Sequence, residues 1–375
     1  MKKHNPRCPA CKSQRTIKRG SERKRKRYFC KKCHKSFSIY YGPKQQILWI
    51  PHIDGVPFRK LGDEYKLSPA QAYAKTIREL KTVPDNTLLT QQYCDPAKFS
   101  GILVLDGKFV KVAEHGQKIP FIYAIDYLTH DIPVGLLATG ESHVAFVQLF
   151  RMLRQCNYPL KVVVCDDRMT VRSALSKAYP KAKIQLCQNH FLENLRRVLH
   201  VRTENTYHRF FTSLRDRVFL KAKDEQAISQ ALQYVLKRYG QQDTLVRDII
   251  FEIYERSEIL FQYLTIPGCP RDTNLVELYN SHLQGRLKSI KGFESFAGAQ
   301  RWLNAWMIRR RTKTLTDCDE KFKRLNGYPS LFWTIKDGME WPTILGVKPP
   351  QKHLERTTEP TILIPQNSAL PVRMN

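Results

Sequence analysis

The sequence predicts an α/β core that carries an all-helical insertion and follows two small modules, a zinc ribbon and a helix-turn-helix. Three observations lead to this prediction. Short apolar runs alternate with helical patterns from residue 102 onward. Two Cys-x-x-Cys pairs lie within the first 35 residues. Between residues 44 and 81, a short helical stretch precedes a second helix with a serine cap.

The composition points to nucleic acid as the partner. The 375 residues include 63 Lys and Arg against 34 Asp and Glu, which gives a net charge of +29. A surface this basic concentrates polyanions and releases their counterions on binding. No apolar run reaches the length of a membrane span, and the basic start of the chain is not followed by the apolar segment of a signal peptide. We therefore expect a cytoplasmic protein that associates with DNA and not with a membrane.

The first module is expected over residues 1–40. Cys8, Cys11, Cys30 and Cys33 form two knuckles separated by eighteen residues, a spacing that suits one structural Zn²⁺. His34 is an alternative to Cys33 as the fourth ligand. The segment between the knuckles carries a basic run that a ribbon would press against phosphates. This run consists of Arg23, Lys24, Arg25, Lys26 and Arg27.

The second module is expected over residues 41–82. Ser68 is a good helix cap, and Pro69 suits the first helical position. The apolar residues at helical spacing are Ala70, Tyr73, Ala74, Ile77 and Leu80. In a helix-turn-helix, the residues that face the major groove would be Gln71, Lys75 and Arg78. The alternative is a helical hairpin with no role in DNA binding, and residues 83–98 are expected to be a linker.

The first part of the core is expected over residues 99–200. Strands are expected at residues 102–105, 108–112, 119–125, 161–165 and 183–186, and residues 133–138 form either a further strand or an irregular return. Helices are expected at 142–155, 171–179 and 189–200. Three antiparallel strands followed by helix, strand, helix and strand is the order of an RNase H-like sheet.

The rest of the chain is expected to be mostly helical. Residues 201–270 show no strand pattern and would form the helical insertion. Residues 271–315 would complete the core with helices at 274–290 and 294–313. The second of these helices ends in Arg309, Arg310 and Arg311, which we expect to contact DNA. Residues 316–375 form a C-terminal region that ends in a Pro-rich tail.

Three carboxylates are candidates for a metal site. Asp106 and Asp166 each follow an apolar run, so each is expected at the end of a buried strand, where α/β sheets bind ligands. Two carboxylates brought together repel each other unless a cation lies between them, and oxygen ligands suit Mg²⁺ or Mn²⁺. Glu277 would lie on a polar helix face that it shares with Ser281, Gln284 and Lys288. The residue types leave alternatives open: Asp167 for Asp166, Asp126 as another strand-end acid, and Asp272 or Glu294 for Glu277.

Three segments resemble the catalytic blocks of Mutator-like DDE transposases of the prokaryotic insertion-sequence kind. They are Val104-Leu-Asp-Gly107, then Val163-Val-Cys-Asp-Asp167 with Leu186-Cys-Gln-Asn-His190, and the stretch from Asp272 to Lys288. The resemblance spans roughly residues 100–312 and implies an RNase H-like core. It also implies that Asp106, Asp166 and Glu277 hold two Mg²⁺ or Mn²⁺ ions. Asp167 departs from the small residue that usually follows the second aspartate. Cys187 and His190 match a family Cys-x-x-His element, for which we expect a structural or DNA-positioning role rather than metal binding.

The resemblance implies a DNA transposase. Such an enzyme binds the terminal inverted repeats of its element, exposes 3′-hydroxyl ends and joins them to target DNA by two-metal catalysis. Because two ends must meet, we expect a homodimer or a higher assembly on DNA. Two other hypotheses are a transposase-derived DNA-binding regulator with an inactive core and a structure-specific RNase H-like nuclease.

Overall fold

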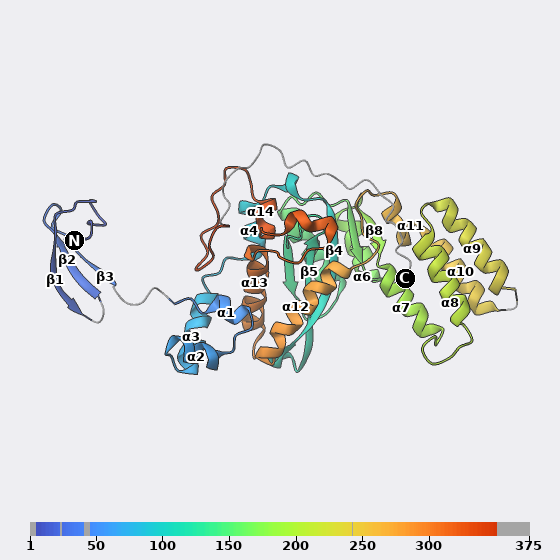
Figure 1. The fold of residues 1–375 in the computed structure, drawn as a ribbon, viewed down its shortest axis with the longest axis horizontal. Helices are drawn as coiled ribbons and strands as arrows, with labels where there is room; N and C mark the ends of the chain where they lie inside the picture. The colour runs from blue at the N-terminus through green and yellow to red at the C-terminus, as the bar shows by residue number, and fades with distance from the viewer. Residues whose placement is uncertain (1–4, 23–24, 41–45, 242, 351–375) are drawn as a thin grey trace.

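The computed structural model describes residues 5–22, 25–40, 46–241 and 243–350. It has a mixed α/β architecture with two separate sheets. In Figure 1, the N-terminal module lies apart from the rest, the larger sheet lies at the centre, and the helices of residues 188–255 extend at the opposite end. Within the described ranges, no helix combines the length and the apolar character that crossing a membrane requires.

The N-terminal module is a three-stranded antiparallel sheet. Its strands are β1 (Thr16–Glu22), β2 (Arg25–Cys30) and β3 (Ser36–Tyr40), with β2 in the middle. Only a few side chains are buried here, among them Cys8, Tyr28 and Cys30. A module this small cannot rely on an apolar core for its stability.

Three short helices follow: α1 (Trp49–Ile53), α2 (Phe58–Tyr65) and α3 (Pro69–Leu80). Ser68 and Gln71 form a capping box at the start of α3, as the predicted cap requires. The predicted apolar face of α3 is confirmed at Leu80 but wrong at Tyr73, which is 49% exposed, whereas Thr76 and Glu79 are buried. Glu79 is buried because its carboxylate accepts hydrogen bonds from the backbone N–H groups of Leu48 and Trp49, at the start of α1.

The expected linker at residues 83–98 is instead a packed part of the core. It contains α4 (Asn86–Tyr93) and the 3₁₀ turn η1 (Pro96–Lys98). Asp85 caps α4, and the buried side chain of Asn86 donates to the carbonyl of Ile132. A segment tied to the core in this way cannot act as a flexible connection.

The central sheet has five strands in the order β6-β5-β4-β7-β8. β5 runs antiparallel to both of its neighbours, β4 and β6, whereas β7 is parallel to β4 and β8 is parallel to β7. The strands are β4 (Ile102–Val112), β5 (Gln117–Asp126), β6 (Val134–Leu137), β7 (Val162–Cys165) and β8 (Lys183–Leu186), with the turn η2 (Ala113–His115) between β4 and β5.

The structure corrects the prediction for the first strand. Residues 102–105 and 108–112 belong to one strand, β4, and Asp106 lies in its middle, opposite Tyr123 of β5. Gly107 does not break the strand. A Cβ atom there would come within 2.7 Å of a carboxylate oxygen of Glu141, so this glycine makes room for a close neighbour.

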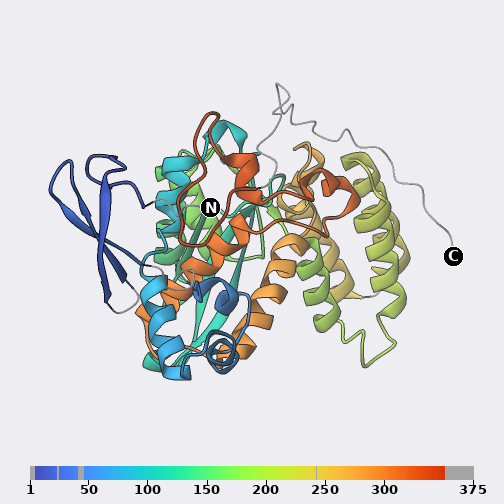
Figure 2. The ribbon, with the colours of Figure 1, turned by 60° about the vertical axis from the view of Figure 1, so that its left-hand side comes forward.

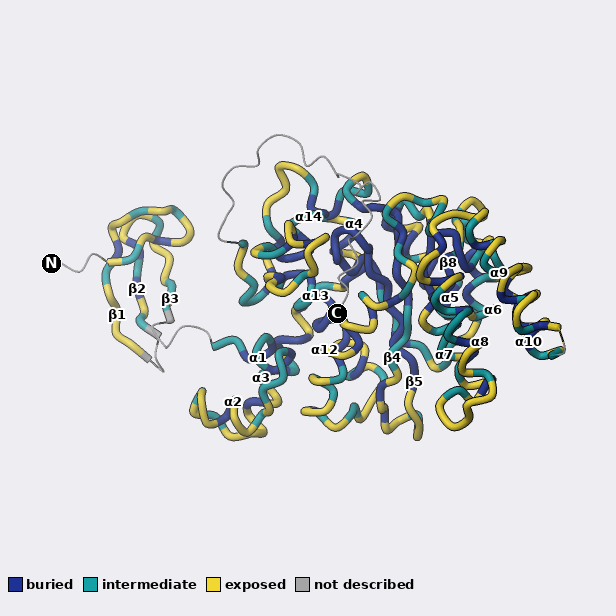
Figure 3. The backbone as a smooth tube through the Cα atoms, turned by 45° about the vertical axis from the view of Figure 1, so that its right-hand side comes forward, coloured by how far each residue is buried: buried dark blue, intermediate teal, exposed yellow. Residues whose placement is uncertain are grey.

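Helices cover both faces of the central sheet. In Figure 3, α12 and α13 lie on one side of β4 and β5, and α5 and α6 lie on the other, with the strands buried between them. The ring of Tyr123 packs against Trp306 of α13, and its hydroxyl donates to Asn280 of α12. The four helices are α5 (His143–Gln155), α6 (Met169–Ala178), α12 (Asn274–Ile290) and α13 (Phe296–Thr312).

The described residues between β8 and α12 form helices joined by turns, without a strand (Figure 2). This insertion has a hydrophobic core of its own. Phe210, Phe219 and Ile253 are among its buried side chains. The elements are α7 (Gln188–Val198), α8 (His208–Leu214), the π-helix η3 (Arg215–Lys221), α9 (Glu225–Tyr239), α10 (Thr244–Glu255), α11 (Ser257–Leu260) and the turn η4 (Gln262–Leu264).

After α13 the chain returns over the core. It forms the turn η5 (Glu320–Leu325) and the helix α14 (Ser330–Thr334). The indole N–H of Trp49 donates to the carbonyl of Leu345, so this return also contacts α1. Most of the expected C-terminal tail, residues 351–375, lies outside the described residues.

Candidate active site and metal centres

The four cysteines of the N-terminal module lie together. Their sulfur atoms are all within 4.8 Å of one another, with 3.6 Å between the sulfurs of Cys8 and Cys33 and 3.5 Å between those of Cys11 and Cys30. Backbone N–H groups, first that of Cys33, lower the pKa of Cys30 to about 6, which favours the thiolate that binds a metal. Four such sulfurs fit one tetrahedral Zn²⁺.

The two knuckles have the same backbone geometry. The residue after each pair, Lys12 or His34, has a positive φ, and its N–H donates to the carbonyl of Cys8 or Cys30. His34 therefore ends a knuckle rather than replacing Cys33. Of the basic run, Arg23 and Lys24 lie outside the described residues, and the side chain of Arg25 is not described either. Lys26 and Arg27 belong to β2, and their role in DNA binding stays a prediction.

The residues expected in the major groove lie on the outer part of α3. Arg78 and Gln71 are exposed, although the side-chain oxygen of Gln71 accepts the backbone N–H of Ser68 in the capping box. Lys75 is partly exposed and forms an ion pair with Glu79, 2.8 Å away. Arg78 also makes a contact within α3, because its Nε donates to the backbone carbonyl of Ala74.

The three candidate carboxylates converge beside the C-terminal end of β7, next to the middle of β4. Asp106 comes from β4, Asp166 follows the neighbouring strand β7, and Glu277 lies in the first turn of α12. Asp106 and Asp166 line one small cavity together, and Asp106 and Glu277 line a larger open cleft of about 660 Å³. Asp106 thus shares a cavity with each of the other two.

Local contacts hold the carboxylates of Asp106 and Glu277 in place. The side-chain amide of Asn280 donates to Oδ2 of Asp106 over 2.7 Å, and the hydroxyl of Thr273 donates to Oε1 of Glu277 over 3.1 Å. Burial raises the pKa of Asp106 to about 6, and the negative charge of Asp166 adds to this rise. Such a conflict between neighbouring carboxylates is what a bound divalent cation relieves.

His190 contacts both of the other candidate carboxylates, Asp166 and Glu277. Its Nδ1 forms an ion pair with Asp166, and its Nε2 lies 3.7 Å from Oε1 of Glu277. A hydrogen bond with Asp166, the largest cause, raises the pKa of His190 to about 11. In this conformation, an imidazolium bridges the carboxylates that are candidates to hold a metal.

Cys187 and His190 reach this position through the sheet. β7 and β8 are parallel neighbours, and the N–H of Cys187 donates to the carbonyl of Cys165, directly before Asp166. Ligand atoms of Asp166, Cys187 and His190 lie within 4.8 Å of one another, which is the second such grouping in the described chain besides the four cysteines. The carboxylates of Asp106, Asp166 and Glu277 are not gathered that tightly.

The remaining alternatives have other contacts. Asp167 binds the guanidinium groups of Arg172 and Arg256. Asp126 is fully buried and accepts hydrogen bonds from Ser100, Thr129 and Tyr158. Asp272 caps the start of α12 through the N–H of Asn274, and exposed Glu294 lies between α12 and α13. None of the four lines the described cleft.

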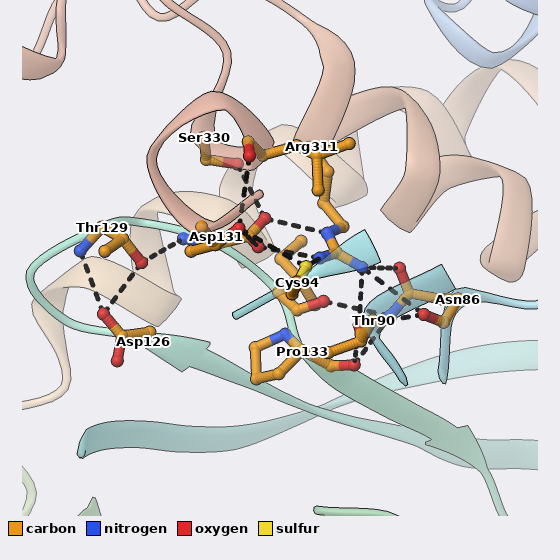
Figure 4. Close-up of polar contacts among 12 residues, drawn as sticks. Asn86, Thr90, Cys94, Asp126, Thr129, Asp131, Pro133, Arg311 and Ser330 are labelled. Carbon is orange, nitrogen blue, oxygen red and sulfur yellow. Dashed lines mark hydrogen bonds and ion pairs between the residues drawn. The ribbon is translucent and has the colours of Figure 1, made fainter. Parts of the chain in front are cut away.

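The expected DNA contact of Arg311 is wrong. Its side chain is 0% exposed and forms a two-pronged ion pair with buried Asp131. Figure 4 shows that its remaining N–H groups point to Asn86, Thr90 and Cys94.

The other two arginines of this run also make contacts within the protein. Arg309 pairs with Asp54, and the guanidinium of Arg310 lies over the ring of Tyr279 at 4.5 Å. Their role in DNA binding stays a prediction.

Sequence reasoning missed three side chains around the carboxylates. Asn280 lies three residues after Glu277 on the same helix, a spacing that places both on one face. Glu141 and Arg168 form an ion pair and line the small cavity with Asp106 and Asp166. Arg168 follows Asp166 closely in the chain, but no pattern singled out Glu141.

Comparison with known proteins gives a family match. The sequence profile described as "Transposase, Mutator family" matches residues 97–313. No curated protein matches the chain. Among solved structures, the chain is similar to the "Drosophila P element transposase strand transfer complex", with 11% identity and a TM-score of 0.36, over 72% of this chain and 94% of that chain.

Proposed function

Because the chain belongs to the Mutator family of transposases, we propose that it cuts and rejoins DNA with divalent metal ions held by Asp106, Asp166 and Glu277. The observation that carries this proposal is the convergence of these carboxylates beside the C-terminal end of β7, where Asp106 lines a cavity with each of the other two. In a two-metal site, Mg²⁺ or Mn²⁺ ions activate the attacking oxygen and stabilise the leaving oxygen.

The sheet supports an RNase H-like core of the DDE type. Three antiparallel strands, then helix, strand, helix and strand, with β4 in the centre of the sheet, is the arrangement that such a core needs. It brings the end of β7 beside the middle of β4, where Asp106 lies, and the helical insertion precedes the helix that carries Glu277. We infer that residues 99–200 and 271–315 form this core and that residues 201–270 form the insertion.

The residues of the site would prepare the carboxylates for metal. Asn280 holds the Asp106 carboxylate, and Thr273 holds that of Glu277. His190 bridges Asp166 and Glu277, so it would have to leave at least one of them when cations bind. We propose two Mg²⁺ or Mn²⁺ ions, in addition to one structural Zn²⁺ at the four cysteines.

The N-terminal modules would recognise the element ends. The net charge of +29 favours binding to duplex DNA, and the cysteine-rich module and α3 each carry exposed basic residues. We propose that they bind terminal repeats while the core acts on the ends and on target DNA. A dimer or a higher assembly would bring two ends together.

Substitution of Asp106 tests the mechanism. We expect Asp106→Asn to abolish Mg²⁺-dependent cleavage and strand transfer on end-bearing DNA while end binding stays intact. Glu294→Gln is the matched control, because Glu294 is an exposed acid outside the cleft and should leave activity unchanged. Full cleavage by Asp106→Asn would remove the mechanism. A wild-type protein that binds ends but cuts none under any metal would instead support the inactive regulator.

A further inference from the structure

The larger cleft extends beyond the carboxylates along α12. It lies between β4 and α12 and has a volume of about 660 Å³. Its α12 wall consists of residues three or four positions apart, which share one face of the helix. The cleft is lined by Asp106, Gly107, Lys108, Glu277, Asn280, Ser281, Gln284, Gly285 and Lys288. Metal binding by the carboxylates uses one end of this cleft and leaves the rest without a role.

Gly285 has no packing reason to be a glycine. It lies in the interior of the 17-residue helix α12, where glycine is among the poorest helix formers. A Cβ atom added to it would meet nothing within 4 Å. By contrast, Cβ atoms at Gly107 and Gly135 would lie only 2.7 and 2.5 Å from Glu141 and Met307. The absence of a side chain at Gly285 therefore avoids no steric clash. Its effect is to keep the cleft open beside α12.

Two lysines place positive charges in this cleft beside the two carboxylates. Lys108 lies two residues after Asp106 on β4, so both side chains are on the same face of the strand. Lys288 lies three turns after Glu277 on α12. Within the part of the chain that the structure describes, neither lysine forms an ion pair. Unpaired ammonium groups beside an uncharged helix face suit an extended chain of phosphates.

We propose that this cleft binds the sugar–phosphate backbone of the DNA strand that leads away from the reacting phosphate. Gly285 lets the strand approach the backbone of α12 closely, and Lys108 and Lys288 pair with its phosphates. Ser281 and Gln284 offer neutral hydrogen-bond donors between the two charged ends. This inference rests on the proposed function, because it takes the reacting phosphate to lie at the carboxylates.

Filling the cleft at Gly285 is the first test. Gly285→Ala and Gly285→Leu should leave the melting temperature unchanged or raise it, because both residues favour a helix more than glycine does. Cleavage and strand transfer should fall, by about 100-fold for Gly285→Leu, because the strand is displaced from the reacting position. The matched control is Ser289→Leu, an exposed position on the same helix outside the cleft, which should retain activity.

Removal of the lysines is the second test. In a fluorescence titration with end-bearing duplex DNA, Lys108→Ala combined with Lys288→Ala should lower the slope of log K against log salt by about 1.8. Lys177→Ala combined with Lys181→Ala, which removes two exposed lysines outside the cleft, is the control for the same change in net charge.

The outcomes separate this inference from the proposed function. If the wild type cleaves DNA and Gly285→Leu cleaves equally well, the cleft does not hold the strand, although the transposase mechanism stands. If the wild type cleaves no DNA, the proposed mechanism is wrong. The salt dependence of DNA binding is then the one measurement that tests whether the cleft binds the strand. An unchanged slope in the double lysine variant would then overturn the inference.

Discussion

The buried side chain of Arg311 contacts parts of the core that are distant in sequence. Its guanidinium contacts Asp131 after β5, and Asn86, Thr90 and Cys94 around α4. The Asp131 carboxylate also accepts a hydrogen bond from Ser330 of α14 (Figure 4). It accepts another from Thr334 of the same helix. A buried charge of this kind is tolerated only because every partner is in place.

We expect Arg311→Met to destabilise the protein strongly. The change leaves Asp131 buried without its counter-charge, which costs about 3–5 kcal/mol. Urea unfolding monitored by circular dichroism measures the loss. Arg309→Met is the comparison, because the pair with Asp54 is 20% and 28% exposed and should contribute about 1 kcal/mol or less. Equal losses in the two variants would contradict the structural role of Arg311.

His130 gives stability a dependence on pH. Burial, helped by the charges of Lys321, Arg310 and Arg324, lowers the pKa of His130 from 6.5 to about 3. Between pH 6.5 and about 3, His130 is therefore protonated in the unfolded state and neutral in the folded state. As pH falls from about 6.5 to 3, this histidine lowers the free energy of unfolding by up to about 1.4 kcal/mol per pH unit.

The matched variant for this effect is His130→Asn. Asparagine tolerates the positive φ of 58° at this position and does not titrate. Chemical unfolding at several pH values should give a shallower decline below pH 6.5 for the variant than for the wild type. Parallel curves would show that His130 is not the responsible group.

At the scale of helices and strands, the local sequence pattern predicted the bounds of a helix better than the end of a strand. The apolar stripe of Val276, Tyr279 and Leu283 predicted α12 with its bounds, because a helix buried on one face displays its period in the sequence. Asp106 and Gly107 suggested a strand end, whereas β4 continues through them. Their conformation depends on Tyr123 and Glu141, which are distant in sequence.

Local sequence patterns likewise predicted some residues of the site, whereas residues whose contacts are distant in sequence were missed. Asp106, Asp166 and Glu277 stand out because each is an acid at a definite place in an apolar pattern. A run of three arginines looks like a DNA-binding surface, but Arg311 pairs with an aspartate 180 residues earlier. Contacts over such separations leave no periodic signal, so Glu141 and Arg311 could be assigned only in three dimensions.

The cysteine-rich module should depend on zinc for its fold. We expect one Zn²⁺ per chain in the wild type and none in Cys30→Ser, measured by mass spectrometry of bound metal. The variant should become sensitive to proteolysis within the first 40 residues, while the melting temperature of the core stays the same. His34→Asn is the control and should keep its zinc, and loss of the metal there would make His34 a ligand.

At the scale of the whole molecule, the core and the insertion have separate hydrophobic interiors. Asp167, directly after Asp166, forms ion pairs with Arg172 of α6 and with Arg256, which lies between α10 and α11 of the insertion. Arg256 also pairs with Glu252 over 2.5 Å. This contact connects the orientation of the insertion to the loop that carries a candidate metal ligand.

We expect Asp167→Ala to loosen the insertion without unfolding the core. Arg172 and Arg256 would lose their shared partner, so amide hydrogen exchange should speed up in α10 and α11 and change little in β4 and β5. Lys183→Ala, which removes an exposed ion pair with Glu258 of α11, is the control and should have a smaller effect. Unchanged exchange after Asp167→Ala would show that the ion pairs do not hold the insertion in place.

The return of the chain after α13 sets the shortest fragment that can fold. The family match ends at residue 313, yet Ser330 and Thr334 supply hydroxyls to Asp131, and Leu345 accepts the indole N–H of Trp49. A recombinant catalytic fragment cut at the family boundary would lack these closing contacts and expose apolar side chains that aggregate. Such a fragment should extend beyond Leu345, which makes the last of these contacts.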